Sequence, residues 1–147
     1  MIEIMIPSTF KTKMHEKLFK NRAISAYHYL DLDKNVVTVK ICADDEMRSL
    51  NKTYRGIDQS TDVLSFNLDF TEPQSDKSYL GDIVISLPTA QIQADEHHQP
   101  LENEMIYLLI HGLLHLMGYD HQTVDQEQEM AALQEKIFNQ VIEKEHE

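Results

Sequence analysis

Hydrophobic and polar residues recur along the chain in two periods, one typical of strands and one typical of helices. Strand patterns, which are rich in β-branched residues or alternate every second position, cover residues 2–6, 35–42, 61–68 and 82–87. Helical patterns cover residues 11–30, 43–55, 88–99, 101–117 and 123–145. The polar, proline-containing stretch 69–81 is expected to be a loop. This order predicts an α+β fold, in which helices pack against one small mixed sheet.

Several helix ends carry residues that favour capping or termination. Asp44 or Asp45 is expected to cap the second predicted helix, where a negative charge also suits the helix dipole. Thr123 or Asp125 is expected to cap the last helix. Gly118 can adopt a positive φ angle and should end the fourth helix. That fourth helix is apolar nearly all round, so it should lie buried at the centre of the fold.

Length and composition indicate a soluble globular protein. The 147 residues suit one domain spanning 1–147, and 41% of them are hydrophobic. The single cysteine, Cys42, lies in an apolar run, which favours a buried, inert thiol in a reducing compartment. The N-terminus has no signal-peptide pattern, and the longest apolar run, residues 105–110, is too short to cross a bilayer. We therefore expect a cytoplasmic protein with no membrane partner.

The negative charge is concentrated in the second half of the chain. The net charge of −12 argues against broad nucleic-acid binding. However, residues 1–77 carry 11 basic and 12 acidic side chains, whereas residues 78–147 carry 2 and 13. A polyanion would therefore have to bind a local basic patch in the first half.

The helix predicted over residues 43–55 offers such a patch. Arg48, Lys52 and Arg55 follow one another at i, i+4 and i+7 and share one face. For Arg48 and Lys52, a solvated surface stripe is as good an interpretation as phosphate binding. The other face of this helix is expected to turn toward the core through three residues: Met47, Leu50 and Tyr54.

The segment HGLLHLMGYDH, residues 111–121, has the spacing of a metal site. A helix turns about 100° per residue, so His111 and His115 project from the same face, one turn apart. After Gly118 the chain can turn back and bring His121 to the same ion. Two histidines at i, i+4 would be evenly balanced between ligands and core residues, but the third favours a metal. Three nitrogen ligands leave a fourth position for water, as in catalytic zinc sites, although other divalent ions are accepted.

The same segment resembles the signature of the YbeY family of bacterial metal-dependent endoribonucleases, which are linked to rRNA maturation. Residues 50–69, LNKTYRGIDQSTDVLSFNLD, and residues 80–86, LGDIVIS, resemble two further blocks of that family in the same order. Together these blocks cover roughly residues 44–125. The resemblance implies a zincin-like site with one Zn²⁺ per chain, cleavage of single-stranded RNA, 16S rRNA 3′-end maturation and ribosome quality control. It also implies contact with the small ribosomal subunit or associated factors.

Residue roles follow from the resemblance at matching positions. His111, His115 and His121 correspond to the metal ligands, and Arg55 to the functional basic residue near the site. The spacing is shared with metzincin proteases, in which a glutamate follows the first histidine, but here that position is Gly112. For RNA, metal-activated water and a guanidinium bound to phosphate can serve instead. Two alternatives remain, a metallopeptidase-like hydrolase with a displaced base and a non-catalytic, metal-stabilised ribosome-associated protein.

Three further residues allow two interpretations each. Asp120 can orient a ligand histidine or cap a turn. Tyr119 can stack on a base or pack over the turn. Asp82 begins a predicted strand, and the sequence does not decide whether it faces the site.

Overall fold

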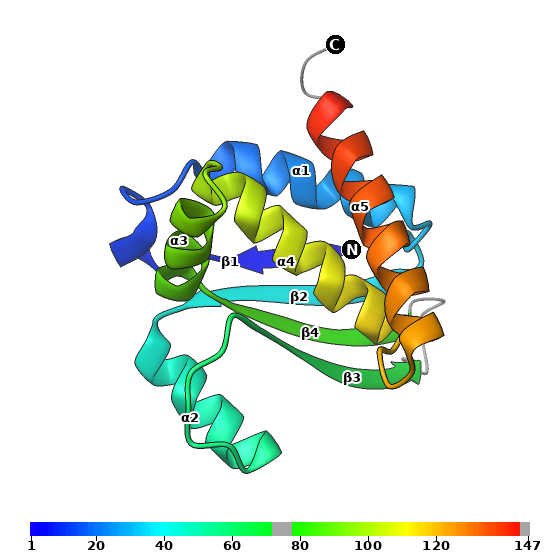
Figure 1. Cartoon of the computed structure of the whole chain (residues 1–147), viewed down its shortest axis with the longest axis horizontal. Helices are drawn as coiled ribbons and strands as arrows, with labels where there is room; N and C mark the ends of the chain where they lie inside the picture. The colour runs from blue at the N-terminus through cyan, green and yellow to red at the C-terminus, as the bar shows by residue number, and fades with distance from the viewer. Residues whose placement is uncertain (72–77, 145–147) are drawn as a thin grey trace.

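A computed structural model describes residues 1–71 and 78–144 of the chain (Figure 1). The strands are β1 (Ile2–Met5), β2 (Asn35–Cys42), β3 (Val63–Thr71) and β4 (Ser78–Ser86). The helices are α1 (Glu16–Tyr29), α2 (Asp44–Arg55), α3 (Leu87–Glu96), α4 (Leu101–Leu116) and α5 (Val124–Lys144), with a short 3-10 helix at Ser8–Phe10. The predicted mixture of five helices and one small sheet is confirmed. No helix in the described ranges is long and apolar enough to cross a membrane.

The sheet is mixed, in the order β1-β2-β4-β3. Strands β1, β2 and β4 are parallel, whereas β3 runs antiparallel to β4 and forms one edge. The register places Ile85 of β4 between Ile41 of β2 and Val63 of β3. The edge strand β3 therefore lies directly beside β4, whose residues 83–86 are buried.

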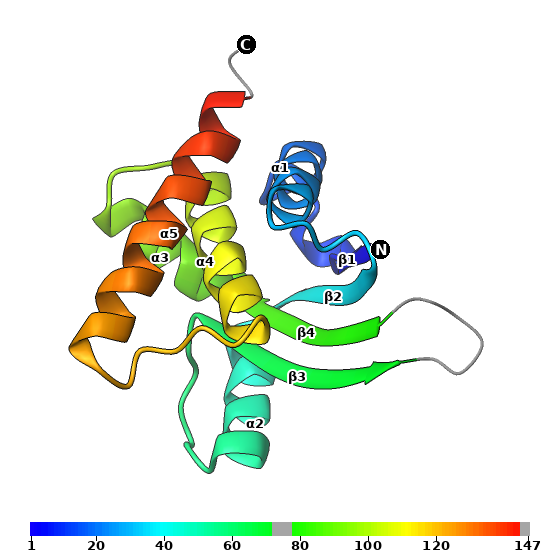
Figure 2. The same ribbon diagram turned by 90° about the vertical axis from the view of Figure 1, so that its right-hand side faces the viewer.

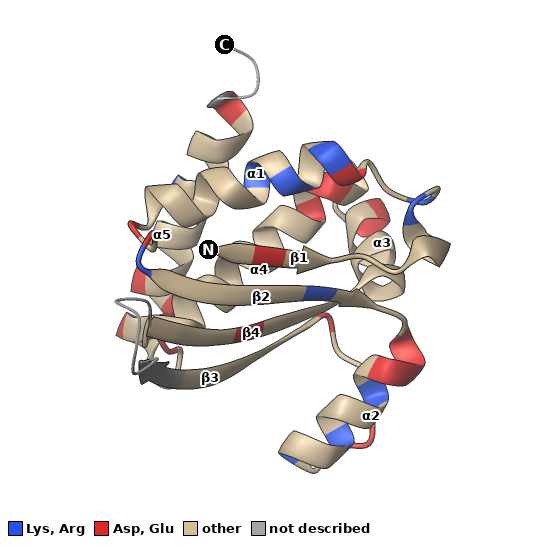
Figure 3. Ribbon diagram, turned by 180° about the vertical axis from the view of Figure 1, so that it is seen from behind, with Lys and Arg blue, Asp and Glu red and all other residues tan. Residues whose placement is uncertain are grey.

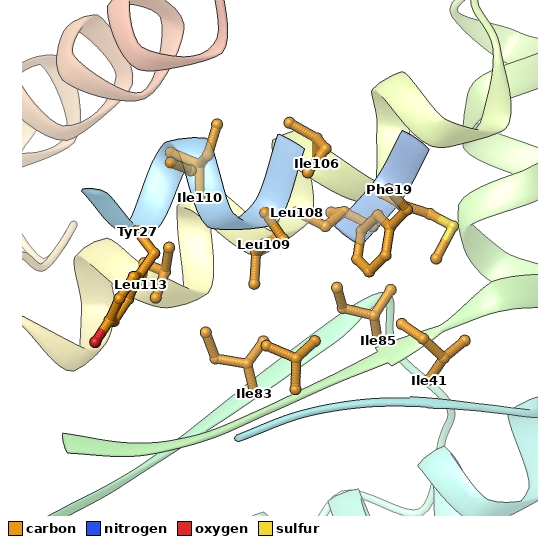
Figure 4. Packing of buried hydrophobic residues seen from close by; sticks show 14 of the residues in the cluster. Phe19, Tyr27, Ile41, Ile83, Ile85, Ile106, Leu108, Leu109, Ile110 and Leu113 are labelled. Atoms are coloured by element: carbon orange, nitrogen blue, oxygen red, sulfur yellow. The ribbon is translucent and has the colours of Figure 1, made fainter. Parts of the chain in front are cut away.

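Helices cover the two faces of the sheet unequally. Helices α1, α3, α4 and α5 lie on one face, and α2 lies on the other (Figures 1 and 2). The side chains of Ile41, Ile83 and Ile85 point from the sheet toward α1 and α4, where they meet Phe19 and Leu109 (Figure 4). All five side chains are fully buried. Helix α4 therefore lies at the centre of the core, as its apolar sequence predicted.

The first helix begins later than the hydrophobic pattern predicted. Helix α1 starts at Glu16 rather than at residue 11. The preceding residue, His15, caps it, because the His15 Nδ1 atom accepts the backbone N–H of Leu18 at 3.2 Å. The backbone N–H of His15 in turn donates to Glu102 at 2.5 Å. Contact with a distant part of the chain thus sets this boundary, and a local pattern cannot reveal it.

The loop predicted over residues 69–81 is wrong at both of its ends. Strand β3 continues to Thr71, and β4 already begins at Ser78. Residues 72–77 lie outside the described part of the chain. Tyr79 pairs with Val36 on one side and with Phe70 on the other. Pairing on both sides of β4 outweighs the polar composition that suggested a loop.

Of the two predicted helix caps, one is confirmed and one is wrong. Thr123 caps α5, because its Oγ1 accepts the N–H of Gln126 at 3.1 Å while the Gln126 side chain accepts the N–H of Thr123. Helix α2 is preceded by Ala43 without a side-chain cap. Asp44 forms other contacts instead, since its Oδ1 accepts hydroxyl hydrogen bonds from three residues: Ser60 (3.0 Å), Ser86 (2.5 Å) and Thr89 (2.8 Å).

Candidate metal centre

The end of α4 is shaped so that the chain reverses just after the second histidine. The helix ends at Leu116, and Gly118 adopts a φ of 101°, as predicted. The N–H of Tyr119 donates to the carbonyl of Leu114 at 3.0 Å, and the N–H of Gly118 donates to that of His115 at 3.0 Å. This pair of bonds is the Schellman arrangement, which satisfies the last carbonyls of the helix. The segment that follows can therefore return toward the face that carries the histidines.

The three histidines meet at one point. One ring nitrogen from each of His111, His115 and His121 lies within 4.8 Å of the other two. The Nε2 atoms of His111 and His115 are 3.0 Å apart. The rings of His111 and His121 are nearly parallel, with centroids 6.2 Å apart and an interplanar angle of 25°. Two of the rings thus come from a rigid helix and one from the exposed segment after it, and together they could hold a metal ion.

The surroundings of His115 favour a neutral imidazole, which is the form that binds metals. Burial lowers the pKa of His115, and the neighbouring His111 and His121 lower it further. A hydrogen bond with the backbone of Tyr119 and the charge of Asp120 act in the opposite direction but are weaker. A neutral nitrogen keeps its lone pair free for coordination. The donor set therefore fits a divalent ion such as Zn²⁺.

A cavity of about 300 Å³ opens in front of the histidines. Besides the three imidazoles, its lining includes the side chain of Arg55 from the end of α2. Thr61, Asp62 and Ser65, from the start of β3 and the segment before it, complete the polar part of the wall. The structure thus brings Arg55 and the histidines, which are more than fifty residues apart in sequence, to one pocket.

Asp62 is held in place by hydrogen bonds. Its Oδ1 accepts the N–H of Val63 at 2.8 Å and the hydroxyl of Thr61 at 3.3 Å. Its Oδ2 accepts the side-chain amide of Gln93 at 3.2 Å. Asp62 therefore fixes the wall of the cavity that faces the histidines.

The cationic face of α2 is only partly available to a ligand. Figure 3 shows acidic residues at the start of α2 and basic residues further along it. Arg48 forms an ion pair with Asp58, with Nε and Oδ1 2.8 Å apart. Among the side chains that the structure describes, those of residues 1–68 and 78–143, no acidic group forms an ion pair with Lys52 or Arg55. The ion pair with Asp58 favours the interpretation of Arg48 as a solvated surface residue. Arg55, by contrast, has a guanidinium that can bind a ligand.

The predicted core face of α2 is partly wrong. Met47 is fully buried and Leu50 is half-buried, as expected. Tyr54 is 66% exposed instead, and it contacts Phe66 edge-on with ring centroids 5.1 Å apart. Asn51 takes the buried position, and its side-chain amide donates to the carbonyl of Gln59 at 2.9 Å. A buried asparagine that satisfies a loop carbonyl cannot be recognised from hydrophobic periodicity.

The structure also separates the alternatives for the residues around the motif. The carboxylate of Asp120 accepts the backbone N–H of His121 at 2.7 Å, which favours the turn cap. Tyr119 is half-buried and packs against the core, which favours packing over base stacking. Side chains alternate along β4, so Asp82 points away from the α4 face on which its neighbour Ile83 lies. Burial raises the pKa of Asp82, but its carboxyl does not line the cavity.

Four residues near the histidines were not singled out from the sequence: Thr61, Asp62, Ser65 and Gln134. The first three lie in the block TDVLSFN, and the resemblance of this block to the family could have indicated that they lie near the site. Gln134 lies on α5, and its Oε1 atom is 3.2 Å from Nδ1 of His111. No local pattern marks it, because its role depends on how α5 packs against α4.

Comparisons with known proteins agree with this geometry. Residues 5–142 match the family described as Endoribonuclease YbeY. The protein of that name from Persephonella marina is 40% identical over 127 residues, which cover 86% of this chain and 83% of the relative. That from Halalkalibacterium halodurans is 37% identical over 137 residues, or 86% of each chain. The solution structure of TM1509 from Thermotoga maritima matches with a TM-score of 0.69 and 28% identity over 99% of this chain and 92% of that chain. The chain therefore belongs to the Endoribonuclease YbeY family.

Proposed function

We propose that this protein cleaves single-stranded RNA internally at a divalent metal ion, with Zn²⁺ as the expected ion. The enzyme class follows from family membership, which makes the protein an endoribonuclease and RNA its substrate. The ligands in this proposal are His111, His115 and His121, and Arg55 is the residue that binds phosphate. The observation that carries the proposal is the meeting of three histidines and Arg55 around one polar cavity.

The residues of the cavity suit the cleavage of a phosphodiester. A divalent ion held by His111, His115 and His121 would supply Lewis acidity and would lower the pKa of water to about 7. The Arg55 guanidinium can bind two phosphate oxygens at once and so position the scissile group. Its positive charge also opposes the negative charge that develops during cleavage. Thr61 and Ser65 add hydroxyl groups to the wall of the same cavity.

Gly112 supports RNA rather than peptide as the substrate. At the position after the first histidine, zinc proteases carry the glutamate that removes a proton from water. Here that position has no side chain and lies in the wall of the cavity. The carboxylate that does line the wall, that of Asp62, accepts hydrogen bonds from three donors. An anionic substrate is better served by the free guanidinium of Arg55 than by a second carboxylate.

One observation favours the metallopeptidase alternative. Strand β3 is at the edge of the sheet and lines the cavity beside the histidines. An exposed strand edge can bind an extended peptide by strand addition. The absence of a glutamate at position 112 counts against this alternative, and a peptide assay decides between the two.

The proposal extends to the biological role of the enzyme. We place the enzyme in the cytoplasm, in the maturation of the 16S rRNA 3′ end and in ribosome quality control, working on the small subunit or with its associated factors. The resemblance of three sequence blocks to the family supports this role. That residues 1–147 form one endoribonuclease domain also stays a prediction.

The test is cleavage of a short single-stranded RNA by the purified protein, with and without a chelator. We expect cleavage that is lost with chelator, restored by Zn²⁺ or another divalent ion, and absent in His115→Ala. His98→Asn is the matched control, because His98 is exposed and its φ of 53° suits asparagine. Elemental analysis should find one ion per chain in the control and none in the triple alanine variant of His111, His115 and His121. Cleavage that resists chelation, or full metal content in the triple variant, would refute the proposed site.

A non-catalytic metal protein would give a different result. It would bind the ion through the same histidines but would leave both RNA and a peptide panel intact. A peptidase would cleave the panel and leave the RNA intact. The three functions therefore differ in one set of measurements on the same preparations.

A further inference from the structure

A buried glutamine on α5 contacts the metal-site histidine on α4. Gln134 is 5% exposed. Its Oε1 atom lies 3.2 Å from Nδ1 of His111, and its Nε2 atom donates to the backbone carbonyl of Tyr107 at 3.1 Å. One amide thus connects the last helix to both the backbone of α4 and the ring of a proposed ligand.

The contact with Tyr107 fixes which way the amide points. A backbone carbonyl can only accept a hydrogen bond, so the amide nitrogen of Gln134 must face it. The amide oxygen then faces His111, and an oxygen can only accept. The Nδ1 atom of His111 must therefore carry the hydrogen. A reversed amide would place a donor against the proton-bearing side of the ring and would lose the bond to Tyr107.

We infer that Gln134 is a positioning residue for the metal site, which holds His111 in the tautomer whose Nε2 lone pair faces His115 and His121. This inference rests on the proposed function, because it assigns a role to Gln134 at that same site. Its observed basis is the pair of amide hydrogen bonds and the burial of the side chain. A ligand histidine is generally oriented in this way, by an acceptor on the nitrogen that does not bind the ion.

The arrangement of the other imidazoles agrees with this tautomer. Nε2 of His111 and Nε2 of His115 are 3.0 Å apart, close enough for the lone pairs of both atoms to face one ion. If Nδ1 of His111 bears the proton, its Nε2 carries a lone pair. The lone pair of His111 therefore already points into the space that the three ring nitrogens share.

The packing of α5 keeps Gln134 in register with His111. Met130 and Ile137, one turn before and one turn after Gln134, are both buried in the core. Tyr107 and Phe138 add an edge-on ring contact between α4 and α5, with centroids 5.4 Å apart. The last helix therefore does more than cover the core, because it sets the orientation of one of the proposed ligands.

The first test is the affinity for Zn²⁺, measured by competition with a chromophoric chelator. Gln134→Met keeps the length of the side chain and removes the acceptor. We expect it to weaken Zn²⁺ binding by about 10- to 100-fold, the usual effect of losing such a partner. Gln134→Glu keeps an acceptor and should retain binding close to that of the unchanged protein. Ile137→Val is the matched control, because it loosens α5 packing and changes neither hydrogen-bond partner of His111.

The second test is the tautomer of His111 in the metal-free protein, read from the nitrogen chemical shifts of the ring. Protonation at Nδ1 is expected in the unchanged protein, in Gln134→Glu and in Ile137→Val. A shift toward the Nε2-protonated form is expected in Gln134→Met. The inference is wrong if Gln134→Met binds Zn²⁺ as tightly as the unchanged protein. It is also wrong if Ile137→Val loses affinity as strongly as Gln134→Met, since the effect would then come from packing.

Neither measurement depends on RNA cleavage. If the protein bound Zn²⁺ through the histidines without cleaving RNA, the proposed activity would fail while the role of Gln134 could still be read. If Gln134→Met left affinity and tautomer unchanged while RNA was cleaved, the activity would stand and Gln134 would be removed from the site.

Discussion

Gly112 lies directly against Ile83. A Cβ atom at Gly112 would be 2.9 Å from Cγ2 of Ile83 and 3.1 Å from its Cδ1. Ile83 is fully buried on β4 and cannot move into solvent. Helix α4 therefore approaches the sheet closely at the one position where zinc proteases carry their glutamate. Gly112 therefore allows α4 to pack closely on β4, and it also lines the cavity.

Replacing Gly112 with alanine should lower the stability of the fold. Alanine favours a helix over glycine by about 1 kcal/mol, which works in favour of the variant. Crowding of a well-packed core costs about 1–3 kcal/mol, which outweighs that gain. We therefore expect a net loss on the order of 1 kcal/mol in urea unfolding. In an Ile83→Ala background the same change should become neutral or stabilising, and equal losses in both backgrounds would contradict the contact.

Gly112→Glu should not produce appreciable peptidase activity. The added carboxylate must displace Ile83 before it can reach the cavity, and a peptidase also needs pockets that hold an extended peptide. The measurement is turnover of a peptide panel, with Gly112→Gln as the control of equal size. Melting temperatures of both variants should fall together. Efficient turnover by the glutamate variant alone would show that the metallopeptidase alternative has been underrated.

Arg55→Ala should abolish most RNA cleavage while it leaves folding and metal content nearly unchanged. Arg55 is exposed and lines the cavity, so its removal disturbs little packing. Loss of one donor to the reacting group costs about 10²–10³ in rate. Arg55→Lys should recover only part of this, because an ammonium keeps the charge without the paired donors. Kinetics on one short RNA provide the measurement.

Two neighbouring residues supply controls for that experiment. Arg48→Ala should change cleavage little, because Arg48 is paired with Asp58. Lys52→Ala should weaken binding and reduce its salt dependence, as expected for a non-specific phosphate contact. A folded, metal-loaded Arg55→Ala protein that cleaves at the normal rate would remove Arg55 from the mechanism.

Asp44 should contribute stability that disappears in acid. Burial acts to raise the pKa of its carboxyl, but hydrogen bonds from Ser86, Thr89 and Ser60 together lower it below the usual value. A lowered pKa in the folded state stabilises the fold above the unfolded pKa, near pH 4, and this contribution is lost as the pH falls through the folded value. Asp44→Asn should therefore cost about 1 kcal/mol at pH 7 and less at an acid pH well below 4.

The control for that prediction is Asp45→Asn. The Asp45 carboxylate is exposed and accepts only the N–H of the next residue within the described part of the chain. Its replacement should change urea unfolding little at either pH. A pH-independent loss in Asp44→Asn would mean that its hydroxyl partners do not depend on its charge.

The sequence predicted the parts of the molecule that depend on local spacing. His111 and His115 share a helical face because of the helix period, and Gly118 ends that helix because glycine tolerates its positive φ. The family resemblance predicted that Arg55 lies near the site, and the structure places it in the same cavity as the histidines.

The features that could not be predicted depend on contacts between distant segments. Gln134 reaches His111 only because α5 packs on α4. Tyr54 was expected in the core, but Asn51 occupies the buried position because its amide satisfies the carbonyl of Gln59. The beginning of β4 looked like a loop until its pairing with two neighbours was known. Hydrophobic periodicity reports burial of one face, and it contains no information on which buried polar group finds a partner.

The orientation of helix α2 determines the position of Arg55, which is the last residue of that helix. Its first residue, Asp44, is anchored by three hydroxyl groups, whereas the last turn is exposed and reaches the body of the protein through Tyr54 and Phe66. The two ends of the helix are about 16 Å apart, so a tilt of about 5° at the anchor displaces the far end by roughly 1.4 Å. A displacement of that size is enough to misalign a reacting group and cost about 10²-fold in rate. Substitutions at Asp44, which does not line the cavity, can therefore reduce catalysis by displacing the guanidinium of Arg55.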